Sequence, residues 1–237
     1  MGVLLIAVAL GLLLTSPSPA HAGVGEGLQT IVLQNNNAPA DPKPLPSEIP
    51  LFPLPEVSLF PGVSRPFLIF EPRYRDMIAD ALAGDRIIGM VALRPGFEKD
   101  YEGRPPIYEV GCAGRIQEFE KLADGRYVIL LRGLTTFRIA REDQRKPYRL
   151  ARVEEVPDLL KNEERGQLST LRERLTQLLY VALPLGVEPP DPDLDDAEFV
   201  NVTALNLSMS EAERQQLLER SSVLARARAL VDRLDQK

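Results

Sequence analysis

The sequence predicts an α+β protein in which a small β-barrel is followed by an α-helical bundle. Between Ile49 and Val156, short runs of β-branched and aromatic residues are separated by proline, glycine and Asp-Gly turns. This pattern is typical of clipped strands in a closed or nearly closed sheet. From Pro157 onward, leucines recur at helical spacing, which predicts three or four packed helices.

The most informative segment of the barrel half is the proline-rich run from Ile49 to Tyr74. Proline has no backbone N–H donor, so within a sheet it is confined to strand starts, edges and bulges. The run is therefore expected to form short strands that curl instead of lying flat. Its six prolines are Pro50, Pro53, Pro55, Pro61, Pro66 and Pro72.

The rest of the barrel half is expected to contain one helix and several strands. Apolar residues at helical spacing predict a helix over 71–82, with Gly84 as its stop. Asp124-Gly125 predicts a hairpin. The predicted strands are 86–94, 108–122, 126–134, 135–141 and 148–156, which sets the barrel at residues 49–156.

The helical half is assigned to residues 157–237. A first helix ends at Pro184, and an acidic, proline-rich break at 189–196 precedes a short helix through Phe199. Ser210 and Glu213 form a capping box before a single last helix. The apolar face of the first helix is Leu168, Leu171, Leu175, Leu178, Leu179 and Ala182, and that of the last repeats every seven residues at Leu217, Leu224 and Val231.

Charge and composition exclude several classes of active site. The 237 residues carry a formal net charge of −6, which disfavours nucleic acid as a general partner because phosphate backbones are repelled. Cys112 and His21 are the only residues of their kinds, so a disulfide, a Ser-His-Asp triad and a His-ligated metal site are not expected. The phosphate-loop pattern GxxxxGK[ST] is absent as well. We therefore expect no cofactor, no metal and no catalysis.

The segment before the barrel is expected to be a leader and a tether. Val3–Leu14 is an apolar stretch of twelve residues, whereas a membrane span needs about 20. Ala20-His21-Ala22 supplies a cleavage pattern, so residues 1–22 predict a signal peptide cut after Ala22 and an exported, periplasmic or secreted protein. A misassigned start codon would instead mean a cytoplasmic protein, and a retained leader would be an anchor. Residues 23–48 are rich in Pro and Asn and predict a disordered tether.

Five motifs, in order, resemble the N-terminal substrate-binding domain of Lon proteases. Together they cover about residues 49–235. They are IPLFPLPEVSLFPG (49–62) with FEPRY (70–74), YEVGCAGRI (108–116), DGRY (124–127), RGLTTFRI (132–139) and SEAERQQLLE (210–219).

This resemblance implies a PUA-like β-barrel followed by an α-helical subdomain, and a role in recognising unfolded or tagged polypeptide. Full-length Lon proteases continue into ATPase and Ser-Lys protease modules. This chain carries neither and so resembles a stand-alone substrate-binding domain. The expected partners are polypeptide clients or a partner protein, bound in a groove between barrel and bundle. RNA binding is the alternative that a PUA-like barrel suggests, and a hydrolase ranks last because no spacing singles out a carboxylate pair.

Glu71, Arg73 and Tyr74 open the predicted helix and are expected to support the fold. Glu71 suits a helix N-terminus, and Arg73 is expected to pair with a carboxylate. Tyr74 is expected in the seam between helix and barrel. Ligand binding by these three residues is the alternative.

Gly111, Cys112 and Gly133 belong to two of the motif strands and are also expected to be structural. A lone cysteine in a glycine-flanked strand is expected to be a small buried hydrophobe, because free cysteine is among the most buried residue types. A reactive thiol is the alternative.

Phe97 and Tyr101 are the candidate peptide-binding residues. They lie in a loop, PGFEKDYEGRPP (95–106), where no strand period explains them. Aromatic side chains on loops are common anchors for partner peptides. The alternative is that they fold back as a lid on the barrel.

The leader makes a direct prediction about the mature protein. We expect its first residue to be Gly23 and the protein to be found outside the cytoplasm, because the apolar stretch and the Ala-His-Ala site together direct cleavage. Terminal sequencing of protein from cell fractions checks this. Intact Met1 in the cytosol would contradict it.

Overall fold

The computed structural model describes residues 44–57, 59–97, 103–184 and 187–236. The predicted leader and most of the predicted tether fall outside these residues. Within the described part, six strands form one mixed sheet: β1 (Glu48–Leu54), β2 (Ser64–Ile69), β3 (Ile87–Ala92), β4 (Val110–Lys121), β5 (Tyr127–Asp143) and β6 (Arg149–Val156).

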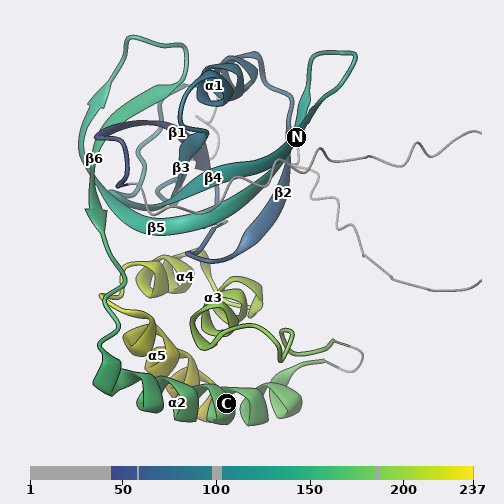
Figure 1. Cartoon of the computed structure of the whole chain (residues 1–237), viewed down its shortest axis with the longest axis vertical. Helices are drawn as coiled ribbons and strands as arrows, with labels where there is room; N and C mark the ends of the chain where they lie inside the picture. The colour runs from purple at the N-terminus through teal and green to yellow at the C-terminus, as the bar shows by residue number, and fades with distance from the viewer. Residues whose placement is uncertain (1–43, 58, 98–102, 185–186, 237) are drawn as a thin grey trace, which may run out of the picture. The chain divides into compact units, whose positions relative to one another are not determined.

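The sheet closes into a barrel because β5 pairs with three other strands (Figure 1). The strand order is β2-β5-β4-β3-β1-β6, and a further β5–β6 pairing joins the ends of a five-stranded ring. Residues 127–132 of β5 pair with β2, and residues 136–143 pair with β6. β1 and β3 are parallel, and the other pairs are antiparallel. The predicted fold class, a β-barrel followed by helices, is confirmed.

The two strands predicted at 126–134 and 135–141 form one strand, β5. The register with β4 shifts between Gly133 and Thr135, so Leu134 is the extra residue of a β-bulge. A bulge bends the strand and increases its twist. The boundary that the sequence predicted between two strands is thus a bend within one continuous strand. The part before the bend pairs with β2, and the part after it pairs with β6.

The helix expected at 71–82 is α1 (Pro72–Ala83), which lies at the upper end of the barrel in Figure 1. Pro72 occupies the first turn, where the missing N–H costs nothing. The backbone N–H of Gly84 donates to Ala81 at the end of the helix. Its buried face covers the barrel with Tyr74, Met77, Ile78 and Ala81.

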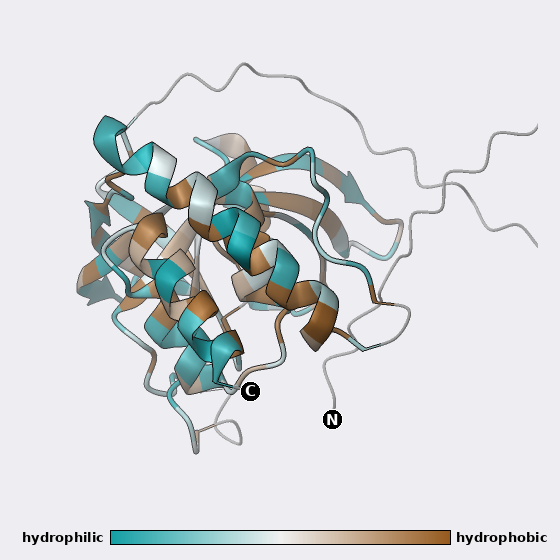
Figure 2. Ribbon diagram, turned by 90° about the horizontal axis from the view of Figure 1, so that it is seen from below, coloured by the Kyte–Doolittle hydropathy of each residue, from teal (hydrophilic) through white to brown (hydrophobic). Residues whose placement is uncertain are grey.

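The second half contains four further helices in the described residues, after a 3₁₀ turn at Asn162–Glu164. In Figure 2, seen from the helical side, hydrophobic and hydrophilic residues alternate along their ribbons, as expected where each helix buries one face. These helices are α2 (Arg165–Ala182), α3 (Asp196–Asn206), α4 (Glu211–Leu218) and α5 (Val223–Asp235).

The single last helix predicted from the seven-residue repeat is wrong. The predicted capping box of Ser210 and Glu213 does open α4, but α4 ends at Leu218. Ser222 then caps α5 by accepting a hydrogen bond from the backbone N–H of Ala225. A serine side chain competes for the hydrogen bonds of the helical backbone and favours a new helix N-terminus. The helix is therefore broken between Leu218 and Val223, although the seven-residue repeat continues in the sequence.

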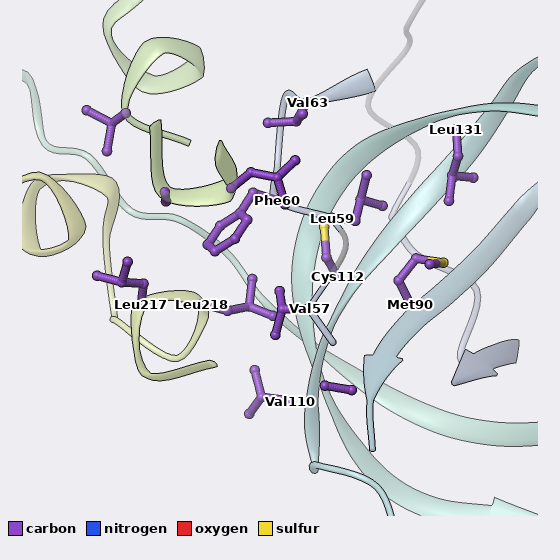
Figure 3. Packing of buried hydrophobic residues seen from close by; sticks show 14 of the residues in the cluster. Val57, Leu59, Phe60, Val63, Met90, Val110, Cys112, Leu131, Leu217 and Leu218 are labelled. Atoms are coloured by element: carbon purple, nitrogen blue, oxygen red, sulfur yellow. The ribbon is translucent and has the colours of Figure 1, made fainter. Parts of the chain in front are cut away.

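One apolar cluster joins the barrel to the helices (Figure 3). Val110 and Cys112 of β4 contribute from the barrel wall, and Leu217 and Leu218 contribute from α4. Phe60, in the β1–β2 connection, is fully buried in the same cluster. Burial shared in this way ties the stability of the two halves together, because neither apolar surface can be covered alone.

A buried charge lies at the centre of this seam. The guanidinium of Arg226, on α5, is 1% exposed and lies 5.7 Å from the centre of the Phe60 ring. Its Nε donates to the carbonyl oxygen of Leu217 at 3.1 Å. Its Nη1 donates to Asp158 at 2.9 Å and to Asn201 at 2.8 Å. One side chain therefore links α3, α4, α5 and the segment that follows the barrel.

Asn201 extends this network to the barrel, since its Nδ2 donates to the carbonyl oxygen of Pro61 at 2.8 Å. Pro61 and Gly62 form a tight turn in which the N–H of Val63 donates to Phe60 at 3.2 Å and Gly62 has a φ of +79°. These are the residues that a type II turn requires. The Pro-Gly turn fixes the direction of the Pro61 carbonyl group. In this direction the carbonyl oxygen can accept the hydrogen bond from the Asn201 side chain.

We expect Arg226→Met to lower the free energy of unfolding by about 3–5 kcal/mol, because it leaves Asp158 and Asn201 facing a buried seam without their cation. Arg228→Met is the matched control, since Arg228 is exposed on the same helix; it should change stability by less than about 0.5 kcal/mol. Urea unfolding measures both. Equal effects of the two substitutions would show that the buried network does not stabilise the fold.

Candidate functional site

A groove of about 320 Å³ lies where the barrel meets the helices, and we call it the junction groove. One wall is the β1–β2 turn and the start of β2, and the other wall is α3 with the segment before it. In Figure 1 the lower part of β2 lies above α3. The apolar lining comes from Val63, Leu194, Val202 and Leu205.

An ion pair bridges the two walls of the junction groove. Arg132 of β5 donates to Glu198 of α3. Gly62 packs on the same glutamate, and a Cβ at Gly62 would lie 2.9 Å from Glu198 Cγ. Arg65 also lines the groove; burial lowers its pKa, and the nearby Glu56 opposes that shift. The groove is thus lined by both apolar and charged side chains.

β2 leads into the junction groove and exposes apolar side chains beyond it. Leu68 is 39% exposed and Phe70, just after the strand, is 53% exposed. Among the described strands, β2 pairs only with β5, so its other edge is open. An open strand edge offers backbone donors and acceptors to a further extended chain.

A carboxyl pair lies at another point of the seam. Glu211, at the start of α4, faces Glu56, which follows β1; burial first, and then hydrogen bonding and repulsion from Glu56, raise the pKa of Glu211. Arg214 partly compensates, with Nη1 at 3.4 Å from Glu211 and 3.9 Å from Glu56. The protonated form of Glu211 is therefore favoured by folding.

Arg73 and Tyr74 line a second pocket, of about 270 Å³, which we call the arginine pocket. Arg73 pairs with Glu71 at 2.9 Å, and its guanidinium carbon lies 4.7 Å from the centre of the Tyr74 ring. Tyr74 is 3% exposed and packs edge-on against Phe52 at 4.7 Å. Glu71 precedes the first turn of α1 without a side-chain capping bond.

The remaining walls of the arginine pocket come from the connections that precede β4 and β6. They contribute Arg104 and Tyr148, and Arg149, the first residue of β6, lies beside them. The hydroxyl of Tyr148 donates to Asp80 at 2.6 Å; burial, together with this bond, raises the pKa of Tyr148, and the bond lowers the pKa of Asp80. Arg149 is 7% exposed and donates to Glu142 at 2.7 Å.

Gly111, Cys112 and Gly133 lie together in the barrel wall under the β1–β2 turn. A Cβ at Gly133 would lie 2.1 Å from the carbonyl oxygen of Phe60, and one at Gly111 would lie 2.4 Å from that of Met90. Cys112 is fully buried, and burial raises the pKa of its thiol. These contacts are those of packing residues and offer no accessible thiolate.

The two predicted peptide-binding aromatics are not brought to the junction groove by any described contact. Phe97 is 40% exposed in the β3–β4 connection and is not among the described residues that line the groove. Tyr101 lies outside the described residues. Further along the same connection, Gly103 and Arg104 line the arginine pocket. The loop singled out in the sequence therefore adjoins a pocket, but a different one from that predicted.

A family model described as the ATP-dependent protease La (LON) substrate-binding domain matches residues 48–236. The chain belongs to this family. The family membership that the five motifs predicted is confirmed. The family model covers nearly all of the described residues.

Relatives and solved structures agree with this assignment. The Lon protease of Anaeromyxobacter dehalogenans is 26% identical over 91% of this chain, and that of Trichlorobacter lovleyi is 30% identical over 74%. This chain spans only about a quarter of their length, 26% and 22% respectively. A Lon N-terminal domain protein from Xanthomonas campestris matches 78% of this chain and 97% of its own, with a TM-score of 0.55 and 27% identity.

A second structure, the N-terminal domain of a Mycobacterium avium complex Lon protease, supports the fold. It matches 79% of this chain and 98% of its own chain, with a TM-score of 0.59 and 19% identity. Within the described residues of our Lon domain, no helix is long and apolar enough to cross a membrane. The same residues contain no group of three or more His, Cys, Asp or Glu side chains placed to hold a metal ion.

The sequence patterns did not indicate the junction groove's α3 wall or the arginine pocket. The short helix expected through Phe199 was not linked to a groove, although Val202 and Leu205 of α3 both line it. The arginine pocket combines four segments that are distant in sequence, so no spacing could show it. Its only sequence signal was the FEPRY motif, which contributes Arg73 and Tyr74.

We expect Glu211→Gln to raise the melting temperature at pH 7 and to have little effect below about pH 4. The raised pKa means that the folded state binds the proton more tightly than the unfolded chain, so stability is lost as pH rises above the ordinary glutamate value of about 4.3. Glutamine mimics the neutral form and removes that loss. Thermal unfolding from pH 4 to 8 measures the difference.

Glu213 provides a control of opposite sign. Its hydrogen bonds from Ser210 lower its pKa, so its contribution is present at neutral pH and is lost as pH falls. Glu213→Gln should therefore lower the melting temperature at pH 7. A stabilising effect of both substitutions would point to net charge alone as the cause.

Proposed function

We propose that this Lon domain is a non-catalytic polypeptide-recognition module that binds extended, apolar segments of unfolded protein. The observation that carries the proposal is the junction groove, whose lining includes four apolar side chains and the start of β2. Leu68 and Phe70 remain exposed on β2 and just after it, although the neighbouring Ile69 is buried. Exposed apolar side chains grouped beside a groove mark interaction surfaces in proteins.

The open edge of β2 supports an extended ligand in particular. A peptide that adds as a further strand gains backbone hydrogen bonds that do not depend on its sequence. Its alternate side chains would face Leu68 and Phe70, and its end would enter the junction groove between Val63 and Val202. This combination suits clients that share exposed apolar segments and no common sequence.

The loop after β3 supplies an additional anchor in this proposal. Phe97 is 40% exposed, and an aromatic ring held on a loop can contact a chain that extends past the barrel. Tyr101, outside the described residues, remains the second predicted anchor for the peptide.

We expect Leu68→Glu and Phe70→Glu each to weaken binding of a fluorescein-labelled, apolar decapeptide by about tenfold, because a charge must be buried where an apolar contact was made. Val181→Glu is the matched control, since Val181 is 87% exposed on α2 and is not among the described residues that line the groove. Fluorescence anisotropy measures all three affinities.

Two outcomes would move or remove the site. Loss of binding in Val181→Glu alone would transfer recognition to α2. Displacement of the peptide by a single-stranded RNA of similar length, with steep dependence on salt, would favour the RNA-binding alternative that PUA-like barrels suggest.

A further inference from the structure

We propose that the arginine pocket binds the carboxylate of a polypeptide, and this inference rests on the proposed function in polypeptide recognition. The pocket is built on the barrel by α1, the end of β1 and the two connections that precede β4 and β6. It is separate from the junction groove, because the two share no lining residue among those described.

The charge of the pocket favours an anion. Its lining contains Arg73, Arg104 and Arg149 and no acidic residue among those described. Two of these arginines are held by carboxylates outside the lining: Arg73 by Glu71 and Arg149 by Glu142. Such pairs fix the direction of a guanidinium at small cost in side-chain entropy.

Arg104 is left with a positive charge directed to the pocket. The hydrogen bond found for its guanidinium goes to the carbonyl oxygen of Lys146 at 3.4 Å, and no carboxylate of a described residue lies within ion-pair distance of it. Lys146 itself is paired with Asp80 at 2.9 Å. Among the described residues, three of the four cations around the pocket are thus paired with a carboxylate, and the guanidinium of Arg104 is not.

A lining with three arginines and no acidic residue among those described suits a carboxylate. A guanidinium can hold both carboxylate oxygens with two parallel N–H donors. Apart from Gly103, the rest of the described lining consists of rings, from Tyr74, Tyr148, Pro53 and Pro147. A volume of about 270 Å³ with ring-shaped walls fits a single apolar residue next to its carboxylate.

The same chemistry has two sources in a polypeptide, the α-carboxylate of the chain end and the side chain of Asp or Glu. Three labelled decapeptides with one apolar sequence separate them: the free acid, the C-terminal amide, and the amide with one Glu near its end. We expect wild-type protein to bind a carboxylate-bearing peptide about tenfold more tightly than the plain amide. A gain for the free acid alone assigns the chain end, and a gain for the Glu peptide assigns the side chain.

Variants connect this gain to the pocket. Arg104→Gln should abolish the difference between acid and amide while leaving the affinity for the amide unchanged. Arg228→Gln removes the same charge from an exposed site on α5, where the arginine contacts Gln167, and should preserve the difference. Equal binding of all three peptides by wild-type protein, with loss in Phe70→Glu, would overturn this inference and leave the proposed function intact.

A small probe tests the pocket even if no peptide binds. In that case the proposed function fails, and N-acetyl-leucine and its amide are titrated separately while the arginine Nε–Hε signals are followed by NMR. A shift of the Arg104 signal with the acid only would support the carboxylate site. No shift with either compound would overturn it.

Discussion

The guanidinium of Arg226 is the interaction on which the described structure depends most. A buried charge is tolerated where it is paired and hydrogen-bonded, and here Nε donates to Leu217 while Nη1 donates to Asp158 and Asn201. Those partners come from three separate parts of the helical half, and Asn201 adds the β1–β2 turn through Pro61. The angle between barrel and helices is therefore constrained by polar geometry as well as by apolar area, which by itself is non-directional.

This constraint explains why a groove persists at the seam. An apolar junction without directional bonds could close by sliding, because hydrophobic burial does not specify one arrangement. The Asn201 bond and the ion pair of Arg132 with Glu198 hold α3 at a set position against the start of β2. A preformed groove binds an extended chain with less loss of protein entropy than one that must open first.

Local signals in the sequence predicted local structure well. The Ser210–Glu213 capping box and the Asp124-Gly125 turn depend on neighbours within three residues, and both are present. The α4–α5 break was missed because the repeat of Leu217, Leu224 and Val231 continues across it. The junction groove was expected between barrel and bundle, but its α3 wall and the arginine pocket were missed for a related reason: their walls meet only after the chain has folded, and no residue spacing records that closure.

Arginine serves two physical roles in this Lon domain, and the difference between them lies in the partner. Thirteen of the fourteen ion pairs found among the described residues use arginine and one uses lysine. A planar guanidinium that is always charged is suited to bracing a fold, as at Arg226. The same group is suited to capturing a carboxylate when the fold provides none. Arg73 and Arg149 are braced by their own carboxylates, and they set the walls within which the charge of Arg104 can be used for binding.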